Sequence, residues 1–254
     1  MKMSVDEIKK ILSECTYEQF MKQKEILKDD DRKSIKNLIL KYENKFEMLK
    51  EKNEEYNYRK RYETELYEKN FKYIAGVDEV GRGPLAGPVY AAAVILNPKI
   101  DIIEIKDSKK LSHSQRTKIS ERIKNNCIDF SIGYATVEEI DNINILNATK
   151  LAMKRAIEGL KIKPDYLLID ALKLDDVLIP QMPIIKGDDL SVSIGAASII
   201  AKVERDSYMD KMSKIYPQYN FDKNKGYGTK DHIDSIKKFG ICEIHRKGFV
   251  KNFI

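Results

Sequence analysis

Apolar residues recur at helical spacing through the first part of the chain, residues 1–70. Two capping-box patterns, Ser4 with Glu7 and Thr16 with Gln19, each precede a short apolar group. Between Ile35 and Leu49, apolar side chains return every three or four positions, which is typical of an amphipathic helix. The pattern therefore predicts an all-helical segment over residues 1–70.

After residue 70 the pattern changes to short apolar runs that alternate with amphipathic stretches. The predicted strands cover residues 73–77, 88–96, 128–137 and 166–170. The predicted helices cover residues 114–126, 146–160 and 190–213. This alternation predicts an α/β domain over residues 71–254, with a mixed sheet and helices on its faces.

Composition supports the same division of the chain. All 12 glycines and all 7 prolines follow residue 75. Residues 1–70 contain 17 Lys or Arg and 16 Asp or Glu, so +5 of the net charge of +6 belongs to the remainder. Such a surplus fits a nucleic-acid binder and also an ordinary basic protein. The helical segment is either an arm that grips nucleic acid or a small bundle with a solvated charged surface.

Several classes of protein are disfavoured. No apolar run approaches the roughly 18 residues of a membrane helix, and the N-terminus lacks the apolar region of a secretory signal. The cysteines Cys15, Cys127 and Cys242 form no CxxC pair. The three histidines are scattered, so no zinc site is expected. We expect a cytoplasmic protein without disulfides or a membrane partner.

Acidic residues end three of the apolar runs. Asp78 and Glu79 follow YIAGV, Asp170 ends the run YLLI, and Asp188 and Asp189 follow MPIIKG. Carboxylates that meet at one buried edge of a sheet repel one another and take up protons unless a cation is bound. Ligand sets made only of oxygen favour Mg²⁺ or Mn²⁺. The alternative is that each acid forms a turn or caps a helix, and the pattern alone leaves both open.

A glycine-rich turn, GVDEVGRGPLAGP, occupies residues 76–88. It does not match the phosphate loop of nucleotide-binding proteins, because Arg82 and Gly83 stand where that loop requires Lys and Ser or Thr. Gly81 and Gly83 allow the backbone to approach a ligand closely, and Arg82 beside them suits a nucleic-acid backbone. A tight turn with positive φ angles explains the same glycines, and the two explanations are compatible.

Several stretches, taken together in their order and spacing, resemble the ribonuclease HII family. They are YIAGVDEVGRGPLAGPVYAAAVIL (73–96), DSKKLS (107–112), LLID (167–170), KGDDLSVSIGAASIIAKVERD (186–206), NKGYGTKDH (224–232) and HRKGF (245–249). The resemblance covers roughly residues 71–250. It implies a ribonuclease H-like fold, a mixed sheet flanked by helices with a helical C-terminal part. The segment 1–70 resembles the helical extension of some bacterial members.

The resemblance implies an endonuclease for RNA–DNA hybrids and for single ribonucleotides embedded in duplex DNA. The family hydrolyses the phosphodiester on the 5′ side of a ribonucleotide, leaving a 3′-hydroxyl and a 5′-phosphate, which starts ribonucleotide removal from DNA. It also implies two ions, Mn²⁺ or Mg²⁺: one activates the attacking water and the other stabilises the leaving oxygen. We expect a monomer, and a sliding-clamp partner is left open. The implied catalytic metal ligands are Asp78, which is the first choice for binding both ions, Glu79, Asp170 and Asp188.

The same resemblance implies residues that bind the substrate. Gly81, Arg82 and Gly83 would contact the backbone at the RNA–DNA junction and sense the 2′-hydroxyl, the group that distinguishes RNA. Tyr227 would stack on the sugar that follows the ribonucleotide. Phosphates would be bound by Lys109, Lys110, Ser198 and Lys202. For the two lysines of DSKK a solvated turn is an equal alternative. The sequence departs from the family at Gly195, where alanine or serine is more usual.

Two other functions fit parts of the pattern. A non-catalytic nucleic-acid-binding protein on the same fold would be expected to lack one or more of the four acids, and all four are present here. Ribonuclease HIII, which prefers longer hybrids, carries an N-terminal domain that contains a sheet. The helical segment without Gly or Pro disfavours that assignment.

Overall fold

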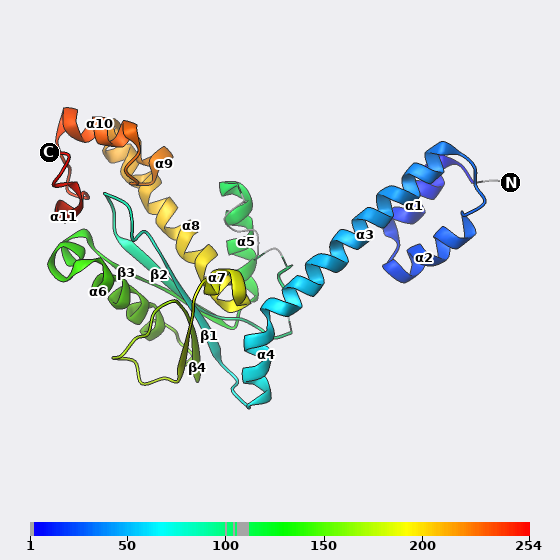
Figure 1. Cartoon of the computed structure of the whole chain (residues 1–254), viewed down its shortest axis with the longest axis horizontal. Coiled ribbons are helices and arrows are strands. Elements are labelled where there is room, and N and C mark those ends of the chain that lie inside the picture. The colour runs from blue at the N-terminus through cyan, green and yellow to red at the C-terminus, as the bar shows by residue number, and fades with distance from the viewer. Residues whose placement is uncertain (1–2, 100, 104, 106–111) are drawn as a thin grey trace. The chain divides into compact units, whose positions relative to one another are not determined.

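The computed structural model describes the chain except for residues 1–2, 100, 104 and 106–111 (Figure 1). It divides into two compact units, Met1–Tyr58 and Arg59–Ile254. Each unit is described by itself below.

The first unit is helical, as predicted. It contains α1 (Val5–Glu14), α2 (Tyr17–Ile26) and α3 (Lys33–Arg59), whose last residue belongs to the second unit. Both expected capping boxes are formed, with Ser4 and Thr16 as the N-caps. The helices share an apolar core made of Ile8, Leu12, Phe20, Leu27, Ile35 and Tyr42. The amphipathic periodicity thus corresponds to a core that belongs to this unit alone.

The second unit begins with the short helix α4 (Arg61–Glu68) and continues with strands and helices in alternation. Its strands are β1 (Ile74–Val80), β2 (Val89–Ile95), β3 (Asp129–Ala135), β4 (Tyr166–Asp170) and β5 (Gln181–Ile184). Its other helices are α5 (His113–Asn126), α6 (Val137–Glu158), α7 (Gly187–Leu190), α8 (Val192–Ile215), α9 (Phe221–Asn224), α10 (Lys230–Phe239) and α11 (Lys247–Val250). The predicted α/β class with a helical C-terminal part is confirmed.

One mixed sheet organises this unit, with the strand order β3-β2-β1-β4-β5. β1 pairs antiparallel with β2 and parallel with β4. The parallel register pairs Val77 with Ile169. The residues that follow, Asp78 in β1 and Asp170 in β4, are therefore neighbours at the same edge of the sheet.

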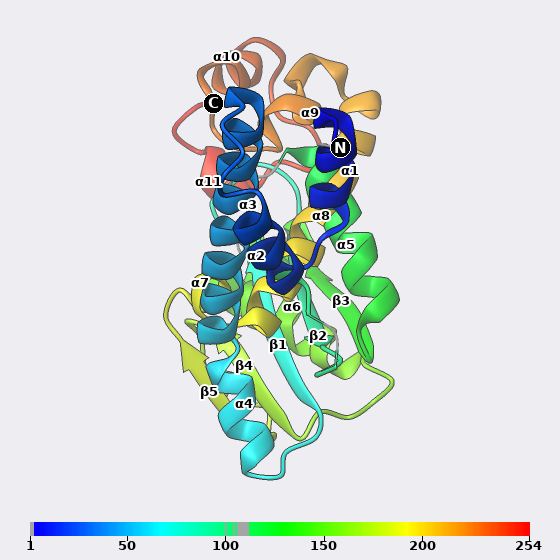
Figure 2. The same cartoon turned by 90° about the vertical axis from the view of Figure 1, so that its right-hand side faces the viewer.

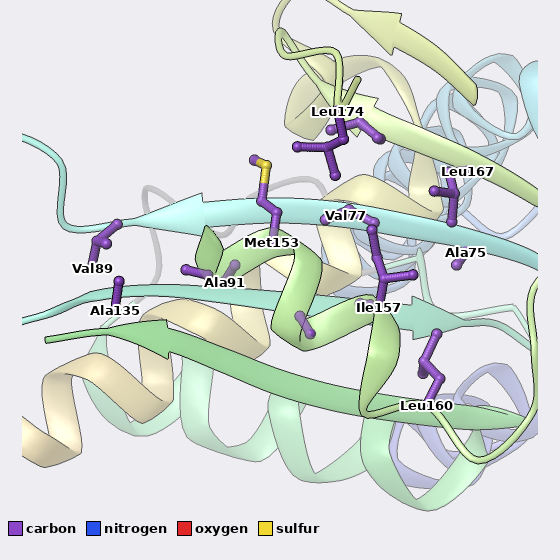
Figure 3. Close-up of a cluster of buried hydrophobic side chains, with 14 of the residues drawn as sticks. Ala75, Val77, Val89, Ala91, Ala135, Met153, Ile157, Leu160, Leu167 and Leu174 are labelled. Atoms are coloured by element: carbon purple, nitrogen blue, oxygen red, sulfur yellow. The ribbon is translucent and has the colours of Figure 1, made fainter. Parts of the chain in front are cut away.

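Helices cover both faces of the sheet. α6 packs on one face, where Met153 and Ile157 meet Val77, Ala91 and Leu167 in the main apolar core (Figure 3). α8 crosses β1 and β2 on the other face, and α5 packs beside α8 (Figure 2). Within the described residues, no helix combines the length and the apolar character that crossing a bilayer requires.

The start of α6 differs from the prediction. The strand expected over residues 128–137 ends at Ala135, because Thr136 caps α6 in a capping box with Glu139. The helix then contains a kink at Asn144, whose φ is 65°. This break interrupts the helical periodicity, so that the sequence pattern predicts a helix only from residue 146 onward.

Strand β5 is absent from the sequence prediction. It is only four residues long and contains Pro183, which lacks the N–H group of a strand interior. β5 lies at the edge of the sheet, where proline is tolerated. Its pairing with β4 gives it a strand conformation that its own sequence does not favour.

Candidate active site

Three carboxylates meet where β1 and β4 end. Asp78, Glu79 and Asp170 each offer one oxygen, and these atoms lie within 4.8 Å of one another. Neighbouring residues in a strand normally face opposite sides, and β1 continues through both acids to Val80, yet their carboxylates reach one point. Among the described residues, no other set of three His, Cys, Asp or Glu side chains is close enough to share an ion.

The environment of these acids disfavours their charged forms. Burial raises the pKa of Asp78 well above its usual value, and the neighbouring Glu79 and Asp170 raise it further. The hydroxyl of Ser198 acts against this shift in pKa through a hydrogen bond to Asp78. Burial also raises the pKa of Glu79, while Arg82, whose Nη1 lies 3.4 Å from Oε1, lowers it. The described side chains around the cluster therefore supply too little positive charge to offset its carboxylates.

A cleft of about 390 Å³ opens over the cluster. It is lined by Asp78, Glu79, Val80, Arg116, Asp170, Asp188, Ser198, Ile199, Lys202 and Tyr227. All four acids named from the sequence line this cleft. Asp188 comes from the short helix α7 and not from a strand. Asp170 meets the same turn, since its Oδ1 accepts a hydrogen bond from the N–H of Gly187 at 2.6 Å.

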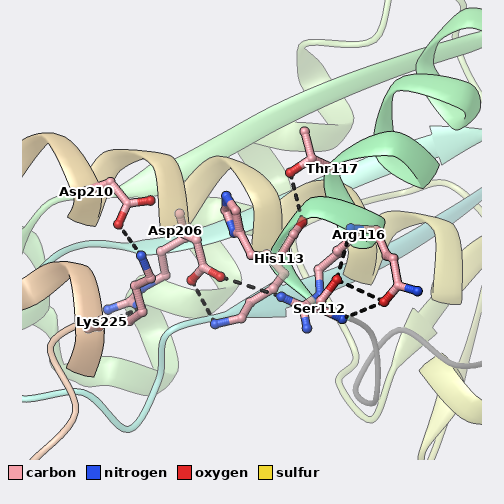
Figure 4. Close-up of polar contacts among 10 residues, drawn as sticks. Ser112, His113, Arg116, Thr117, Asp206, Asp210 and Lys225 are labelled. Carbon is pink, nitrogen blue, oxygen red and sulfur yellow. Dashed lines mark hydrogen bonds and ion pairs between the residues drawn. The ribbon is translucent and has the colours of Figure 1, made fainter.

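Two cations of the cleft share one buried acid. Asp206 is only 3% exposed; it accepts a hydrogen bond from Lys202 at 2.7 Å and lies 3.8 Å from Arg116 (Figure 4). Lys202 was expected at the site, but Arg116 was not. Arg116 lies on α5 outside every family-like stretch, so only its place next to α8 brings it to the cleft.

The glycine-rich turn rests on two buried arginines. Arg205 donates hydrogen bonds to the carbonyl oxygens of Ala86, Pro88 and Lys225, and Arg246 donates to those of Gly81, Arg82 and Gly87. In the described chain, all their hydrogen bonds go to main-chain carbonyls. Burial lowers the pKa of Arg246 to about 9. The turn is thus shaped by two guanidinium groups that no carboxylate neutralises through a hydrogen bond.

The two glycines of the turn differ in what requires them. Gly81 has a φ of 94°, and a Cβ atom there would lie 2.2 Å from Nε of Arg205, so the fold itself demands glycine. A Cβ at Gly83 would meet nothing closer than Cε1 of Tyr227, at 3.9 Å. A tight turn therefore explains the glycine at position 81. It does not explain the absence of a side chain at Gly83, where the fold leaves room for one.

Tyr227 lies beside this turn and is held by a chain of buried hydrogen bonds. Nδ1 of His232 lies 2.9 Å from the carbonyl oxygen of Tyr227, and its Nε2 lies 3.1 Å from Nε2 of His245. The main-chain N–H of Cys242 donates to Nδ1 of His245 at 2.9 Å. A carbonyl oxygen only accepts, so His232 donates from Nδ1 and must accept from Nε2–H of His245. Every group is satisfied when both rings are neutral.

The two histidines look unrelated in the sequence, but the fold pairs them. Their ring nitrogens are used as hydrogen-bond partners of each other and of the main chain. Their signal in the sequence is weak, because their contact depends on how α10 and the C-terminal segment fold back. Lys109 and Lys110 lie outside the described residues, so their proposed contacts stay predictions.

Comparison with known families bears on this arrangement. The model of the family "Ribonuclease HII" matches residues 75–252, and that of the "Ribonuclease HII N-terminal domain" matches residues 4–67. The chain belongs to the ribonuclease HII family. A ribonuclease HII of Clostridioides difficile is 47% identical over 99% of this chain and 98% of its own length. The resemblance identified from the sequence motifs is thereby confirmed, and the chain is an endonuclease of the ribonuclease H class.

Solved structures agree with the fold. The ribonuclease H2 of Pyrococcus horikoshii matches with a TM-score of 0.61 and 27% identity, over 72% of this chain and 97% of its own. RNase HII of Archaeoglobus fulgidus, in a complex with PCNA, matches with a TM-score of 0.59 and 24% identity, over 71% of this chain and 96% of its own. Bst-RNase HIII, in complex with Mn²⁺, matches with a TM-score of 0.51 and 20% identity, over 66% of this chain and 63% of its own. The last two likenesses concern the fold alone.

The buried histidine pair predicts a pH dependence of stability. Burial, and then the neighbouring His232, lower the pKa of His245 to about 4, while in the unfolded chain histidine titrates near 6.5. Between about pH 6.5 and pH 4, His245 is therefore protonated in the unfolded state but neutral in the folded state. We expect the free energy of unfolding to fall by about 1 kcal/mol per pH unit on this account.

Urea denaturation at pH 7 and pH 5 measures this effect in the wild type and in His245→Gln, whose amide can still donate to His232. The variant should lose part of the pH dependence. His113→Gln, at an exposed position on α5, is the matched control and should keep all of it. An unchanged slope in His245→Gln would contradict the neutral histidine pair.

Proposed function

We propose that this protein cleaves the phosphodiester on the 5′ side of a ribonucleotide, both in RNA–DNA hybrids and at single ribonucleotides in duplex DNA. The products would be a 3′-hydroxyl and a 5′-phosphate, the start of ribonucleotide removal from DNA. The observation that carries the proposal is that the three-acid cluster, the remaining acid and Tyr227 line one cleft. The glycine-rich turn lies beside it, so acids suited to catalysis and groups suited to substrate reading are adjacent.

The donor set of the cleft fits divalent cations. Its carboxylates offer only oxygen ligands, which suit Mg²⁺ and Mn²⁺, and burial together with the neighbouring acids raises the pKa of Asp78, a shift that a bound cation would oppose. We propose that Asp78, Glu79, Asp170 and Asp188 hold two such ions. When bound, the ions would supply a nucleophilic water at neutral pH and neutralise charge on the leaving oxygen. Of the three histidines, His232 and His245 are engaged with the Tyr227 main chain and with each other, and none lines the cleft, which leaves the acids as the groups for this chemistry.

The cations around the cleft suit a nucleic-acid backbone. Arg116 and Lys202 line it, and their tether to Asp206 reduces the freedom that they would lose on binding a phosphate. We propose that Ser198 supports Asp78 in addition to its predicted phosphate contact, because its hydroxyl is bonded to that carboxylate. This arrangement separates groups that neutralise phosphate from groups that bind the ions.

The junction of RNA and DNA would be read between Gly83 and Tyr227. Tyr227 is 42% exposed, although its main-chain carbonyl is bonded by His232. A Cβ atom at Gly83 would lie 3.9 Å from the ring of Tyr227. Because glycine has no side chain, this face of the turn is open. We propose that Gly81, Arg82 and Gly83 contact the sugar-phosphate backbone there, and that Tyr227 stacks on the next sugar.

A non-catalytic nucleic-acid-binding protein, the other function that the sequence pattern allows, is disfavoured by the family assignment. Under that alternative the acids would serve only the fold. Removing one carboxylate would then change no cleavage rate, because the protein would cleave nothing. The buried carboxyl group of Asp78 also disfavours it, since an apolar or amide side chain would serve a purely structural role at lower cost.

Asp78→Asn should reduce cleavage of a duplex with one embedded ribonucleotide by roughly 10³-fold, because ion-based charge stabilisation is worth several kcal/mol. Gel analysis of single-turnover cleavage measures the loss. Asp175→Asn, at a side chain that is 68% exposed outside the cleft, should cleave at the wild-type rate. Cleavage by Asp78→Asn at that same rate would contradict the assignment of the metal ligands.

Tyr227→Ala should slow cleavage at a single ribonucleotide about 10-fold or more, since one stacking contact is worth about 1–3 kcal/mol. Tyr227→Phe should retain much of the activity because the ring remains. Tyr73→Ala removes a tyrosine of similar exposure, 39%, at the start of β1 and serves as the control. Equal single-turnover rates for Tyr227→Ala and the wild type would rule out the recognition role.

A further inference from the structure

Two buried, oppositely charged side chains sit where α3 gives way to α4. Arg59 and Glu63 are each only 2% exposed. Both belong to the same compact unit as the cleft, although the sequence pattern places them in the helical extension. Both reach α7, which carries Asp188, and the junction of α7 with α8.

Arg59 contacts the main chain of Asp188 itself. Its Nη2 donates to the carbonyl oxygen of Asp188 at 2.8 Å and lies 3.4 Å from that of Ser191. A guanidinium keeps its charge and its planar fork at all ordinary pH values. The contact therefore fixes the peptide from which the Asp188 side chain projects.

Glu63 fixes the other half of the same turn. Its Oε1 accepts hydrogen bonds from Oγ of Ser191 at 2.6 Å and from the N–H of Ser193 at 3.0 Å. Oγ of Ser191 in turn accepts from the N–H of Ile194, as the N-cap of α8. The carboxylate thus extends the helix cap and ties the first turn of α8 to α4.

Gly195 makes room for this arrangement. A Cβ atom at this position would lie 2.6 Å from Nη2 of Arg59 and 3.0 Å from the carbonyl oxygen of Asp188. It would also lie 2.8 Å from Cγ2 of Ile105. The glycine that departs from the usual family residue therefore sits against the Arg59–Asp188 hydrogen bond.

Asp188 needs such support more than the other acids do. Asp78 and Glu79 lie in β1 and Asp170 ends β4, so the sheet's hydrogen bonds hold their backbones. Asp188 lies in a helix of four residues, entered through Lys186 at a φ of 57°. A single turn of helix is a poor anchor by itself. External contacts must hold Asp188 toward the cleft.

We propose that Arg59 and Glu63 are positioning residues that aim Asp188 into the acidic cleft and thereby set the affinity of the site for divalent cations. The proposal rests on the proposed function, in which Asp188 is a metal ligand. Supporting residues around a metal site typically change its affinity by about 10- to 100-fold when they are lost. Part of what looks like an N-terminal extension thus belongs to the catalytic machinery.

The test is a Mn²⁺ titration of the full-length protein without nucleic acid, followed by the EPR signal of free Mn²⁺. Arg59→Ala should weaken Mn²⁺ binding by about 10-fold or more, and Arg59→Lys should restore part of it. In cleavage assays the Mn²⁺ concentration for half-maximal rate should rise in Arg59→Ala, while the rate at saturating Mn²⁺ changes less. Wild-type Mn²⁺ affinity in Arg59→Ala would overturn the proposal.

Leu66→Ala separates positioning from loss of stability. Leu66 packs α4 against Ile74, Leu168 and Ile194 in an apolar cluster that Leu190 of α7 borders, and its side chain has no polar atom that could bond to the main chain near Asp188. It should lower the unfolding temperature yet keep Mn²⁺ affinity. The outcome to compare is the loss of Mn²⁺ affinity at a given loss of stability. If Leu66→Ala loses as much Mn²⁺ affinity as Arg59→Ala does for the same drop in unfolding temperature, then Arg59 acts only through folding.

Gly195→Ala supplies a second route to the same contact. It should weaken Mn²⁺ binding, and the double variant Arg59→Ala with Gly195→Ala should bind no more weakly than Arg59→Ala alone. Such non-additivity is expected when two changes break one interaction. Full additivity would contradict the coupling of Gly195 to Arg59.

Asp188→Asn tells failure of this inference from failure of the proposed function. If Asp188→Asn loses Mn²⁺ affinity and Arg59→Ala does not, Asp188 is a ligand and the positioning role is wrong. If Asp188→Asn itself binds Mn²⁺ and cleaves like the wild type, the assignment of Asp188 is wrong, and the proposed ligand set falls with it.

Discussion

The mutual repulsion of buried carboxylates is the constraint around which the rest of this protein is arranged. Asp78, Glu79 and Asp170 bring their oxygens within 4.8 Å of one another, and burial raises the pKa of Asp78 and of Glu79. The parallel pairing of β1 with β4 enforces this approach. Acids held so close repel one another, and a divalent cation would supply the charge that balances them.

The surroundings of the cluster divide their tasks in a way that follows from this constraint. Positive groups stand at the rim, where Asp206 restrains Lys202 and Arg116. The glycine-rich turn is held through its main-chain carbonyls by Arg205 and Arg246, and no side chain covers it at Gly83. In the proposed function, the carboxylates would hold divalent cations, the basic side chains would meet phosphates, and the backbone of the turn would contact the sugar.

Sequence and structure differ in what each can reveal about this site. Asp78 and Asp170 could be predicted because each ends an apolar run, and the family-like stretches located the glycine turn and Tyr227. Arg116, His245 and Arg59 could not, because their importance arises from contacts between segments far apart in the chain. Arg59 is the plainest example: its helical spacing resembles that of the solvated residues before it, and only the close approach of Gly195 exposes its role. Strand β5 escaped prediction for the same reason, since its pairing with β4 outweighs Pro183.

The dependence of stability on cations tests the central claim most directly. Thermal unfolding of the wild type and of Asp78→Asn would be compared in EDTA and in Mn²⁺. If the carboxylates repel one another until a cation binds, Asp78→Asn should be the more stable protein in EDTA, and Mn²⁺ should raise the unfolding temperature of the wild type far more than that of the variant. A wild type that is the more stable in EDTA and is indifferent to Mn²⁺ would contradict the account.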